Sequence, residues 1–286
     1  MDFAESDFDA KGVIFEYFLG QRGKDDLAQY FTPRNIVRFM VNFLEPKLGE
    51  TVYDPFCGSG GMLIEAYEFI RKQILFDEKY QDNLNFLRKK TLYGNDKASI
   101  AYVAKLNMIL IGDGHNNIER CDSLKKKARR ECDIVITNIP FNISTEFGNL
   151  YTYPTSEANS ICVQHIIANL TPNPNARAGI IVPNIFVSGD GFQELRKNIE
   201  DNFTITVVAL PEGTFQPYTP SNAYILFIKR KQLVKWSERA NSPIEYYRVQ
   251  QIGFTLNKKK EPIPKDDLSD VISGKITAQK ITQENS

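Results

Sequence analysis

Residues 133–141 of this chain read Asp-Ile-Val-Ile-Thr-Asn-Ile-Pro-Phe and carry its clearest chemical signal. The β-branched run from Ile134 to Ile136 is typical of a strand buried on both faces of a parallel sheet. The run stops at Asn138, and Pro140 cannot continue a central strand because it lacks an N–H group. The stretch therefore predicts an amide, a backbone carbonyl and an aromatic ring at the carboxyl end of a strand, where open α/β sheets bind ligands.

These three groups suit the exocyclic amino group of a nucleobase, which has two N–H donors and a lone pair delocalised into the ring. The Asn138 side-chain oxygen and the Ile139 carbonyl could accept both hydrogens and so make the lone pair available. Phe141 could stack on a base that has left its helix. Taken alone, the four residues fit an ordinary Asn-x-Pro turn better. The chemical interpretation therefore requires a methyl-donor site upstream.

A glycine-rich turn upstream has the features of such a site. Residues 51–53 read as a strand, residues 54–61 read Asp-Pro-Phe-Cys-Gly-Ser-Gly-Gly, and a helix follows from Met62. A strand, a glycine turn and a helix N-terminus together direct backbone N–H groups at a ligand. The turn lacks both the dinucleotide glycine spacing and a phosphate-loop lysine. It therefore favours a ligand with a carboxylate and a sulfonium over a pyrophosphate, and Asp54 could balance the cationic part.

Two further acidic residues follow predicted strands. Residues 92–96 read as the second strand, and an acid such as Asp96 at the end of the strand after a glycine loop usually binds ribose hydroxyls. The third strand and its exit turn are predicted within 116–124, which contains Asp122. Ahead of the glycine turn, Thr32 and Pro33 match an N-cap and the first position of a helix.

The remaining apolar runs complete a mixed sheet. Strands are predicted at 178–183, 204–210 and 223–228, with helices between the earlier strands. Only about a dozen residues separate the last two strands, too few for a helical crossover, so this pair should be antiparallel. Residues 246–249 are a candidate additional strand. The sequence therefore predicts an α/β fold.

Composition limits the functional classes. The chain has 286 residues, with Lys plus Arg at 35 and Asp plus Glu at 35, so no global positive field indicates nucleic acid. The basic run 125–130 is interpreted as a solvated helix face. Four widely spaced cysteines argue against zinc and fit a reducing cytosol. The chain contains no apolar run of about 18 residues, which favours a cytoplasmic protein.

The motifs resemble the γ-class amino methyltransferases that act on adenine in DNA, and most closely the modification subunits of type I restriction-modification systems. The resemblance rests on residues 29–34, 54–61, Asp96, Asp122, 138–141, 179–184, 210–215 and 217–219 in this order. It implies a Rossmann-like S-adenosylmethionine-dependent methyltransferase fold, with a seven-stranded mixed sheet, an antiparallel last strand and helices on both faces. The family tetrapeptide is Asn-Pro-Pro-Phe. Ile139 replaces its first proline but keeps the backbone carbonyl, so we expect the change to be tolerated.

The resemblance further implies site-specific methyl transfer to adenine N6 in DNA. Cofactor binding would involve Gln29, Tyr30, Phe31, Thr32, Pro33, Arg34, Asp54, Phe56, Gly58, Ser59, Gly60, Gly61, Asp96 and Asp122. A flipped-out adenine would be held by Asn138, Ile139, Pro140 and Phe141. No metal is implied. The implied partners are DNA, a specificity subunit and a restriction subunit, with two modification subunits for each specificity subunit and no membrane.

The expected organisation is a helical lead-in over 1–28, a catalytic domain over 29–232 and a C-terminal extension of that domain over 233–286. Three alternatives stay open. The same fold could methylate protein glutamine or RNA, although those enzymes lack the segment that matches residues 29–34. Cytosine N4 methylation is disfavoured because those enzymes usually carry serine where Asn138 stands. The chain could also be a non-catalytic subunit that binds only the cofactor or DNA, in which case Ile139 would mark decay of the catalytic motif.

Overall fold

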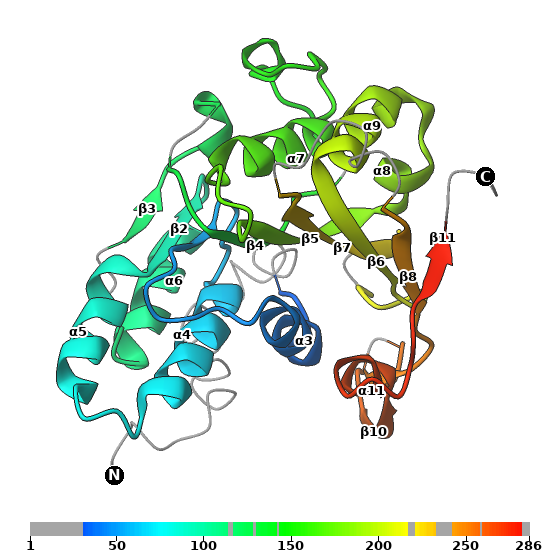
Figure 1. The fold of residues 1–286 in the computed structure, drawn as a ribbon. Coiled ribbons are helices and arrows are strands. Elements are labelled where there is room, and N and C mark those ends of the chain that lie inside the picture. The colour runs from blue at the N-terminus through cyan, green and yellow to red at the C-terminus, as the bar shows by residue number, and fades with distance from the viewer. Residues whose placement is uncertain are drawn as a thin grey trace.

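A nine-stranded mixed sheet forms the centre of the molecule in a computed structural model (Figure 1). The structure describes residues 31–113, 117–127, 130–141, 143–216, 221–232, 242–257 and 259–281. The sheet consists of β1 (Val52–Asp54), β2 (Leu92–Asp96), β3 (Ile118–Arg120), β4 (Ile134–Asn138), β5 (Arg177–Pro183), β6 (Phe203–Ala209), β7 (Ala223–Arg230), β8 (Ile244–Arg248) and β11 (Gln279–Ile281). A separate two-stranded sheet pairs β9 (Ile252–Phe254) with β10 (Pro262–Asp266).

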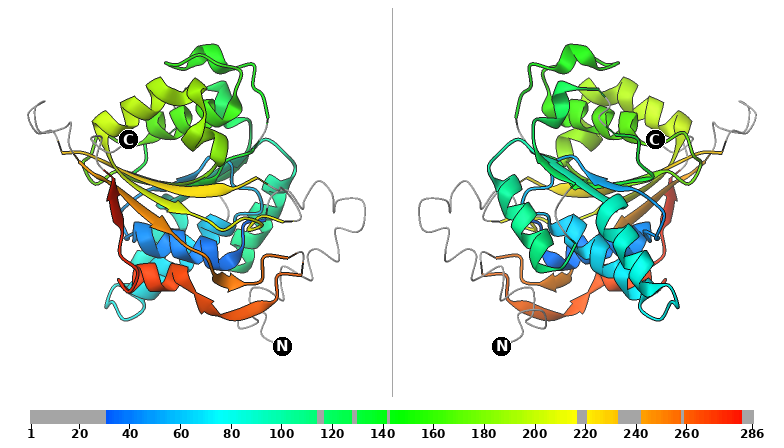
Figure 2. Two further views of the ribbon diagram at one scale, coloured as in Figure 1. Left: turned by 90° about the vertical axis from the view of Figure 1, so that its right-hand side faces the viewer. Right: turned by 90° about the vertical axis from the view of Figure 1, so that its left-hand side faces the viewer.

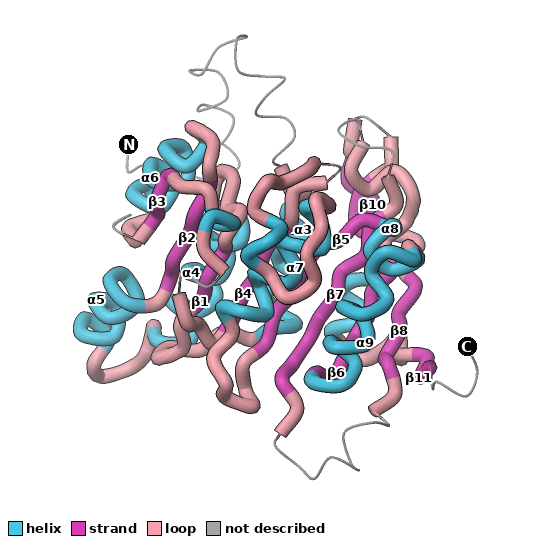
Figure 3. The backbone as a smooth tube through the Cα atoms, turned by 90° about the horizontal axis from the view of Figure 1, so that it is seen from above, coloured by secondary structure: helices cyan, strands magenta, loops and turns pink. Residues whose placement is uncertain are grey.

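The strand order in the large sheet is β11-β8-β6-β7-β5-β4-β1-β2-β3, and the view from above in Figure 3 places β3 at the left end and β11 at the right end. Strand β4 is an inner strand of the sheet and is parallel to both of its neighbours, β1 and β5. Strand β7 lies between β5 and β6 and is antiparallel to both, which confirms the predicted antiparallel pair. The predicted α/β class is therefore confirmed.

The predicted count of seven strands is too low. Strand β8 pairs with β6 and covers most of the candidate strand at 246–249, and β11 then pairs with β8. All three residues of β11 are exposed, so its sequence shows no buried face. A strand held by backbone pairing alone leaves no apolar alternation to detect.

Helices cover both faces of the sheet (Figure 2). The helices are α3 (Arg34–Leu44), α4 (Gly61–Ile74), α5 (Tyr80–Lys90), α6 (Ile100–Leu110), α7 (Ala158–Asn169), α8 (Asn184–Ser188), α9 (Gln193–Asn202) and α11 (Asp267–Ile272). Buried side chains of α3, α4, α6 and α11 share one core cluster, and those of α7, α8 and α9 share another. The two cores lie on opposite faces of the sheet, with α7, α8 and α9 on one side (Figure 1).

Strand β4 is buried from both sides, as its sequence predicts. Ile134 and Ile136 pack into the core of α3 and α4, whereas Val135 packs into the core of α7. Each of the three side chains is at most 1% exposed. Burial of a full aliphatic side chain contributes about 1.5–3 kcal/mol, so these three residues strongly stabilise the position of β4 within the sheet.

Two local predictions are wrong. Thr32 does not cap α3: the N-cap position is Pro33, whose carbonyl accepts the N–H groups of Ile36 and Val37. The basic run is not a helix face in its described part. Only residues 123–125 form a single 3₁₀ turn, because Asp122 caps that turn and the chain then becomes extended at Lys126. The predicted lead-in over 1–28 lies outside the described residues.

Candidate active site

The predicted functional residues meet at one edge of the sheet. Asp54, Asp96 and Asn138 are the last residues of β1, β2 and β4, and Asp122 follows β3. These four strands are parallel neighbours in the order β4-β1-β2-β3, so their carboxyl ends lie side by side (Figure 3). The structure thus brings together acidic and amide side chains from positions 54 to 138, which are 84 residues apart in the sequence.

Asp54 is a buried acid at the start of the glycine turn, with 2% of its surface exposed. Its Oδ1 accepts hydrogen bonds from the Thr137 hydroxyl at 2.6 Å and from the Phe56 N–H at 3.1 Å. Burial raises the pKa of Asp54 to about 7, and the nearby charge of Asp96 adds to the rise, whereas the two hydrogen bonds oppose it. A cation bound beside Asp54 would therefore lower the pKa of this carboxyl and stabilise its ionised form.

The glycine turn needs its glycines for conformation and for space. Gly58 and Gly60 have φ angles of 51° and 89°, in the left-handed region that residues with a Cβ rarely adopt. A Cβ on Gly60 would lie 3.3 Å from the Cβ of Ala104 on α6. Asn107 of the same helix donates a hydrogen bond to the Ser59 carbonyl at 3.0 Å. Helix α6 therefore fixes the shape of the turn, and Gly61 begins α4 directly after it.

Asp96 and Asp122 lie against this turn. Asp96 accepts the N–H groups of Gly58 at 3.1 Å and Ala98 at 2.8 Å, and burial raises its pKa. Asp122 accepts the Leu124 N–H at 3.0 Å. Next to it, the Ser123 hydroxyl donates to the carbonyl of Pro55 at 2.7 Å and so ties the exit of β3 to the glycine turn. The predicted contacts of both acids with a ligand stay predictions.

Asn138 has an unpaired acceptor. Its Nδ2 donates a hydrogen bond to the Thr32 hydroxyl at 3.1 Å. Its Oδ1 is buried, and no described residue donates a hydrogen bond to it. A buried polar atom without a partner costs about 1–3 kcal/mol, so the position is explained if a ligand supplies the donor.

The residues after Asn138 are packed rather than free. The Ile139 N–H donates to the Ile181 carbonyl at 3.4 Å, and its side chain is 2% exposed in the core of α7. Pro140 is half-buried. Phe141 contacts both cores, and its ring meets the Phe215 ring edge-on at 6.3 Å between centroids. The chain therefore leaves the sheet edge on a fixed path.

Of the segment at 29–34, Phe31, Thr32, Pro33 and Arg34 are described and half-buried, whereas Gln29 and Tyr30 lie outside the described residues. Arg34 lies beside the start of α4, since its Nη1 is 3.7 Å from the place of a Cβ on Gly61. Thr32 contacts Asn138, as described above. The segment therefore reaches both the glycine turn and the end of β4.

Sequence reasoning missed two residues of this site. Thr137 bonds Asp54, and the only signal was a polar residue within an otherwise apolar strand. Phe215 packs against Phe141, and it lies in a motif recognised in the sequence without an assigned role. His165 is fully buried between the Tyr151 hydroxyl at 3.1 Å and the Asn169 amide at 3.2 Å, which fits a structural role.

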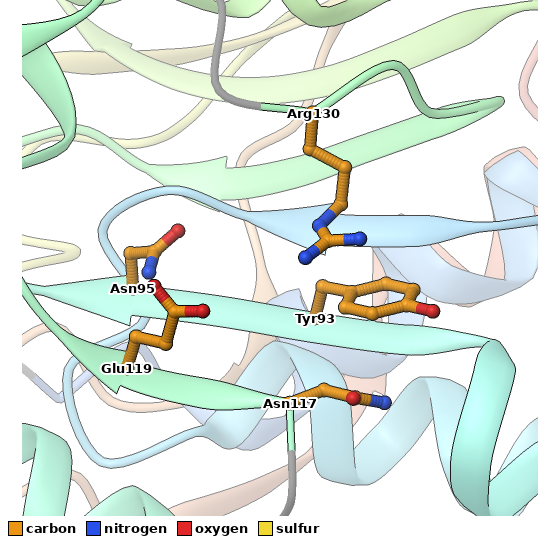
Figure 4. A pocket seen from close by; sticks show the side chains of 5 residues that line it. All are labelled: Tyr93, Asn95, Asn117, Glu119 and Arg130. Atoms are coloured by element: carbon orange, nitrogen blue, oxygen red, sulfur yellow. The ribbon is translucent and has the colours of Figure 1, made fainter.

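Two cavities lie away from this cluster. One, of about 110 Å³, is lined by Tyr93, Asn95, Asn117, Glu119 and Arg130, with the Arg130 guanidinium 3.7 Å from the Tyr93 ring centroid (Figure 4). The other, of about 370 Å³, lies between the loop 152–155 and the start of α9. Neither is lined by a predicted site residue. The candidate site is therefore defined by strand ends and hydrogen bonds.

Within the described ranges, no group of three His, Cys, Asp or Glu side chains could hold a metal ion. In the same part of the chain, no helix has the length and apolar character needed to span a membrane.

A Listeria monocytogenes protein described as a class I S-adenosylmethionine-dependent methyltransferase shares the fold, with a TM-score of 0.57 at 18% identity, over 82% of this chain and 72% of that protein. The chain belongs to the family described as N-6 DNA Methylase, which matches residues 6–281. Its relatives include the EcoEI methylase subunit of a type I restriction enzyme from Escherichia coli, 30% identical over 236 residues. The MjaVII methylase subunit from Methanocaldococcus jannaschii is 38% identical over 256 residues.

The chain spans about half the length of these relatives. The matches cover 78% of this chain and 47% of the Escherichia coli subunit, and 81% of this chain and 42% of the Methanocaldococcus jannaschii subunit. A solved modification subunit from Vibrio vulnificus YJ016 superimposes with a TM-score of 0.76 at 27% identity, over 90% of this chain and 56% of that one.

Proposed function

We propose that this chain transfers a methyl group from S-adenosylmethionine to adenine N6 in DNA, as the modification subunit of a type I restriction-modification system. The observation that carries the proposal is the buried Asn138 Oδ1, which lacks a described donor and lies at a strand end beside the glycine turn. An amino group would supply the missing hydrogen. Family membership favours adenine in DNA as the source of that amino group.

The residues at the sheet edge fit the cofactor. The glycine turn packs tightly against α6, since a Cβ at Gly60 would lie 3.3 Å from the Ala104 Cβ, and the N-terminus of α4 that follows the turn would face the ligand. Asp54 would balance the sulfonium, Asp96 the ribose hydroxyls and Asp122 the adenine amino group, with the segment at 29–34 beside them. When bound, S-adenosylmethionine supplies an electrophilic methyl group.

The protein's part in the reaction is to bind and orient the base. Asn138 Oδ1 and the Ile139 carbonyl would accept the two amino hydrogens, which turns the lone pair toward the methyl donor. Phe141, held by Phe215, would stack on the base. Positioning two reactants in this way lowers the barrier without a general base.

The assembly is a proposal as well, because the chain matches only part of its relatives. We propose that a specificity subunit supplies sequence recognition, that a restriction subunit completes the system and that two modification subunits bind each specificity subunit. A cytoplasmic location fits both the DNA substrate and the four cysteines, which are free in the structure. We propose that the domain boundaries follow residues 28 and 232.

The test is transfer of a tritiated methyl group to DNA, with and without the cognate specificity subunit. We expect transfer by the wild type and none by Asn138→Ala, while both bind the cofactor equally. Asn85→Ala, on the exposed side of α5, is the matched control and should behave as the wild type. Transfer to RNA or to protein glutamine instead of DNA would change the substrate, and cofactor binding without any transfer would support the non-catalytic alternative.

A further inference from the structure

Thr32 and Asn138 lie 106 positions apart in the chain, and their side chains are joined by one hydrogen bond of 3.1 Å. Thr32 does not use this hydroxyl to cap α3, whose N-cap residue is Pro33 without a side-chain bond. The hydroxyl is therefore committed to the end of β4. This contact gives Thr32 a role other than the cofactor contact that its motif implies.

In the structure the Thr32 hydroxyl acts as the acceptor of this hydrogen bond, and the Asn138 amide is held with its Nδ2 toward Thr32. The two ends of an amide have nearly the same size, but one is an acceptor and the other a donor. Because Thr32 accepts from Nδ2, the Oδ1 end points away from Thr32, where it is buried and has no described donor. Rotated by half a turn, the amide would present N–H groups to an incoming amino group, and two donors do not bond.

Other contacts hold the backbone here but leave the amide free to rotate. The neighbouring Thr137 is bonded to Asp54 at 2.6 Å, and the Ile139 N–H is bonded to the Ile181 carbonyl at 3.4 Å. These bonds fix the residues before and after Asn138. Among the described residues, Thr32 is the hydrogen-bond partner of the Asn138 side chain, through Nδ2.

We propose that Thr32 is a positioning residue, which holds the Asn138 amide with its oxygen toward the amino group of the target base. The proposal rests on the proposed function for the identity of that base. It separates Thr32 from the rest of the segment at 29–34. The other residues of that segment would serve cofactor binding, whereas Thr32 would serve the orientation of the base.

Kinetic measurements on two substitutions test the role. Thr32→Val keeps the shape and removes the acceptor, so we expect the single-turnover rate of methyl transfer to fall by about 10- to 100-fold. The Kd of S-adenosylmethionine should change by less than about twofold, because the bond to Asn138 is not a cofactor contact. Thr32→Ser restores the hydroxyl and should recover the rate to within about threefold. Thr204→Val, at an exposed position on β6, is the matched control and should leave both quantities unchanged.

Three results would overturn the proposal: an unchanged rate in Thr32→Val, a loss of cofactor affinity that accounts for the whole effect, or a serine variant as slow as the valine variant. If the wild type transfers no methyl group to DNA, the proposed function fails, and a readout independent of activity decides the inference. In protein labelled with ¹⁵N-asparagine, the side-chain NH₂ signal absent from Asn138→Ala belongs to Asn138. Its protons should exchange with water about tenfold faster in Thr32→Val than in the wild type or Thr32→Ser. Equal exchange in all three proteins would refute the proposed orientation.

Discussion

Asp54 is a carboxyl group buried beside a second acid, and its protonation sets a pH dependence. Its pKa is raised to about 7, mainly because burial removes the solvation of the charged form. Below this pH the Asp54 carboxyl is largely protonated and offers no counter-charge to a sulfonium. A cation that binds beside Asp54 must then displace the proton, which weakens binding.

We therefore expect the affinity for S-adenosylmethionine to rise with pH by up to about tenfold per pH unit below pH 7 and to level off above it. S-adenosylhomocysteine has a neutral sulfur, so the ratio of the two affinities should show the same rise. Calorimetry across this pH range measures both ligands. In Asp54→Asn the ratio should not vary with pH, and a wild-type ratio without pH dependence would place the sulfonium away from Asp54.

The same group affects stability. The folded pKa of Asp54 lies above its ordinary value of 3.8, so the folded protein binds an extra proton between these two values. The contribution of Asp54 to stability is therefore fully present below pH 4 and is lost as the pH rises through about 7. Asp54→Asn removes this change. Urea unfolding at several pH values should show a smaller loss of stability in the mutant over that interval.

Ile139 is the residue that departs from the family tetrapeptide. From the sequence alone, proline at this position should be tolerated unless the Ile139 N–H makes a structural bond. The structure shows such a bond, to the Ile181 carbonyl at 3.4 Å, together with a buried side chain. We expect Ile139→Pro to lose about 0.5–1.5 kcal/mol from the hydrogen bond and more from the lost apolar contacts.

Urea unfolding together with single-turnover kinetics measures the effect of Ile139→Pro on stability and rate. Ile139→Val is the control, because it keeps the N–H and should cost about 0.5–1.5 kcal/mol from the lost methylene alone. If the proline variant were as stable and as active as the wild type, the 3.4 Å bond would contribute nothing.

At the scale of structural elements, the glycine turn depends on its packing against helix α6. Gly60 has a φ of 89° and lies against α6, whereas Gly49 has a φ of 98° with no atom near the place of a Cβ. Both Gly→Ala substitutions cost about 1–2 kcal/mol from the left-handed backbone. Gly60→Ala should cost more, because Ala104 must move, and it should also weaken cofactor binding. Thermal unfolding measures the stability of each variant, and calorimetry measures its affinity for the cofactor. If Gly60→Ala bound the cofactor as tightly as Gly49→Ala, the turn would not be part of the cofactor site.

Elements buried on both faces were predictable from the sequence, and elements held by distant partners were not. The run at 134–136 correctly predicted β4, because its β-branched side chains pack into the cores on both faces of the sheet. Strand β11 has no buried side chain, and its place depends on backbone pairing with β8. At the site, motifs predicted the acids and Asn138. The hydrogen bonds from Thr137 to Asp54 and from Asn138 to Thr32 depend on tertiary contacts over 83 and 106 positions, which no local pattern encodes.

At the scale of the whole molecule, the C-terminal part contributes to the same core as the helices beside the candidate site. Ile252, Phe254, Leu268 and Val271 are buried in the cluster that contains α3 and α4. Strand β8 pairs with β6 and so covers an edge of the main sheet. We therefore predict that the core requires the residues that follow the proposed boundary at residue 232.

A chain truncated after residue 232 should not fold stably. Each buried aliphatic or aromatic side chain contributes about 1.5–3 kcal/mol, so losing the four core residues removes a large share of the roughly 5–15 kcal/mol that stabilises a typical domain. The truncation also leaves the β6 edge unpaired, which favours aggregation. Size-exclusion chromatography and thermal unfolding compare it with the full chain, and removal of residues 282–286 is the control, since these lie beyond β11. A monomeric truncated protein with an unchanged Tm would show that residues 29–232 fold as a domain without the extension.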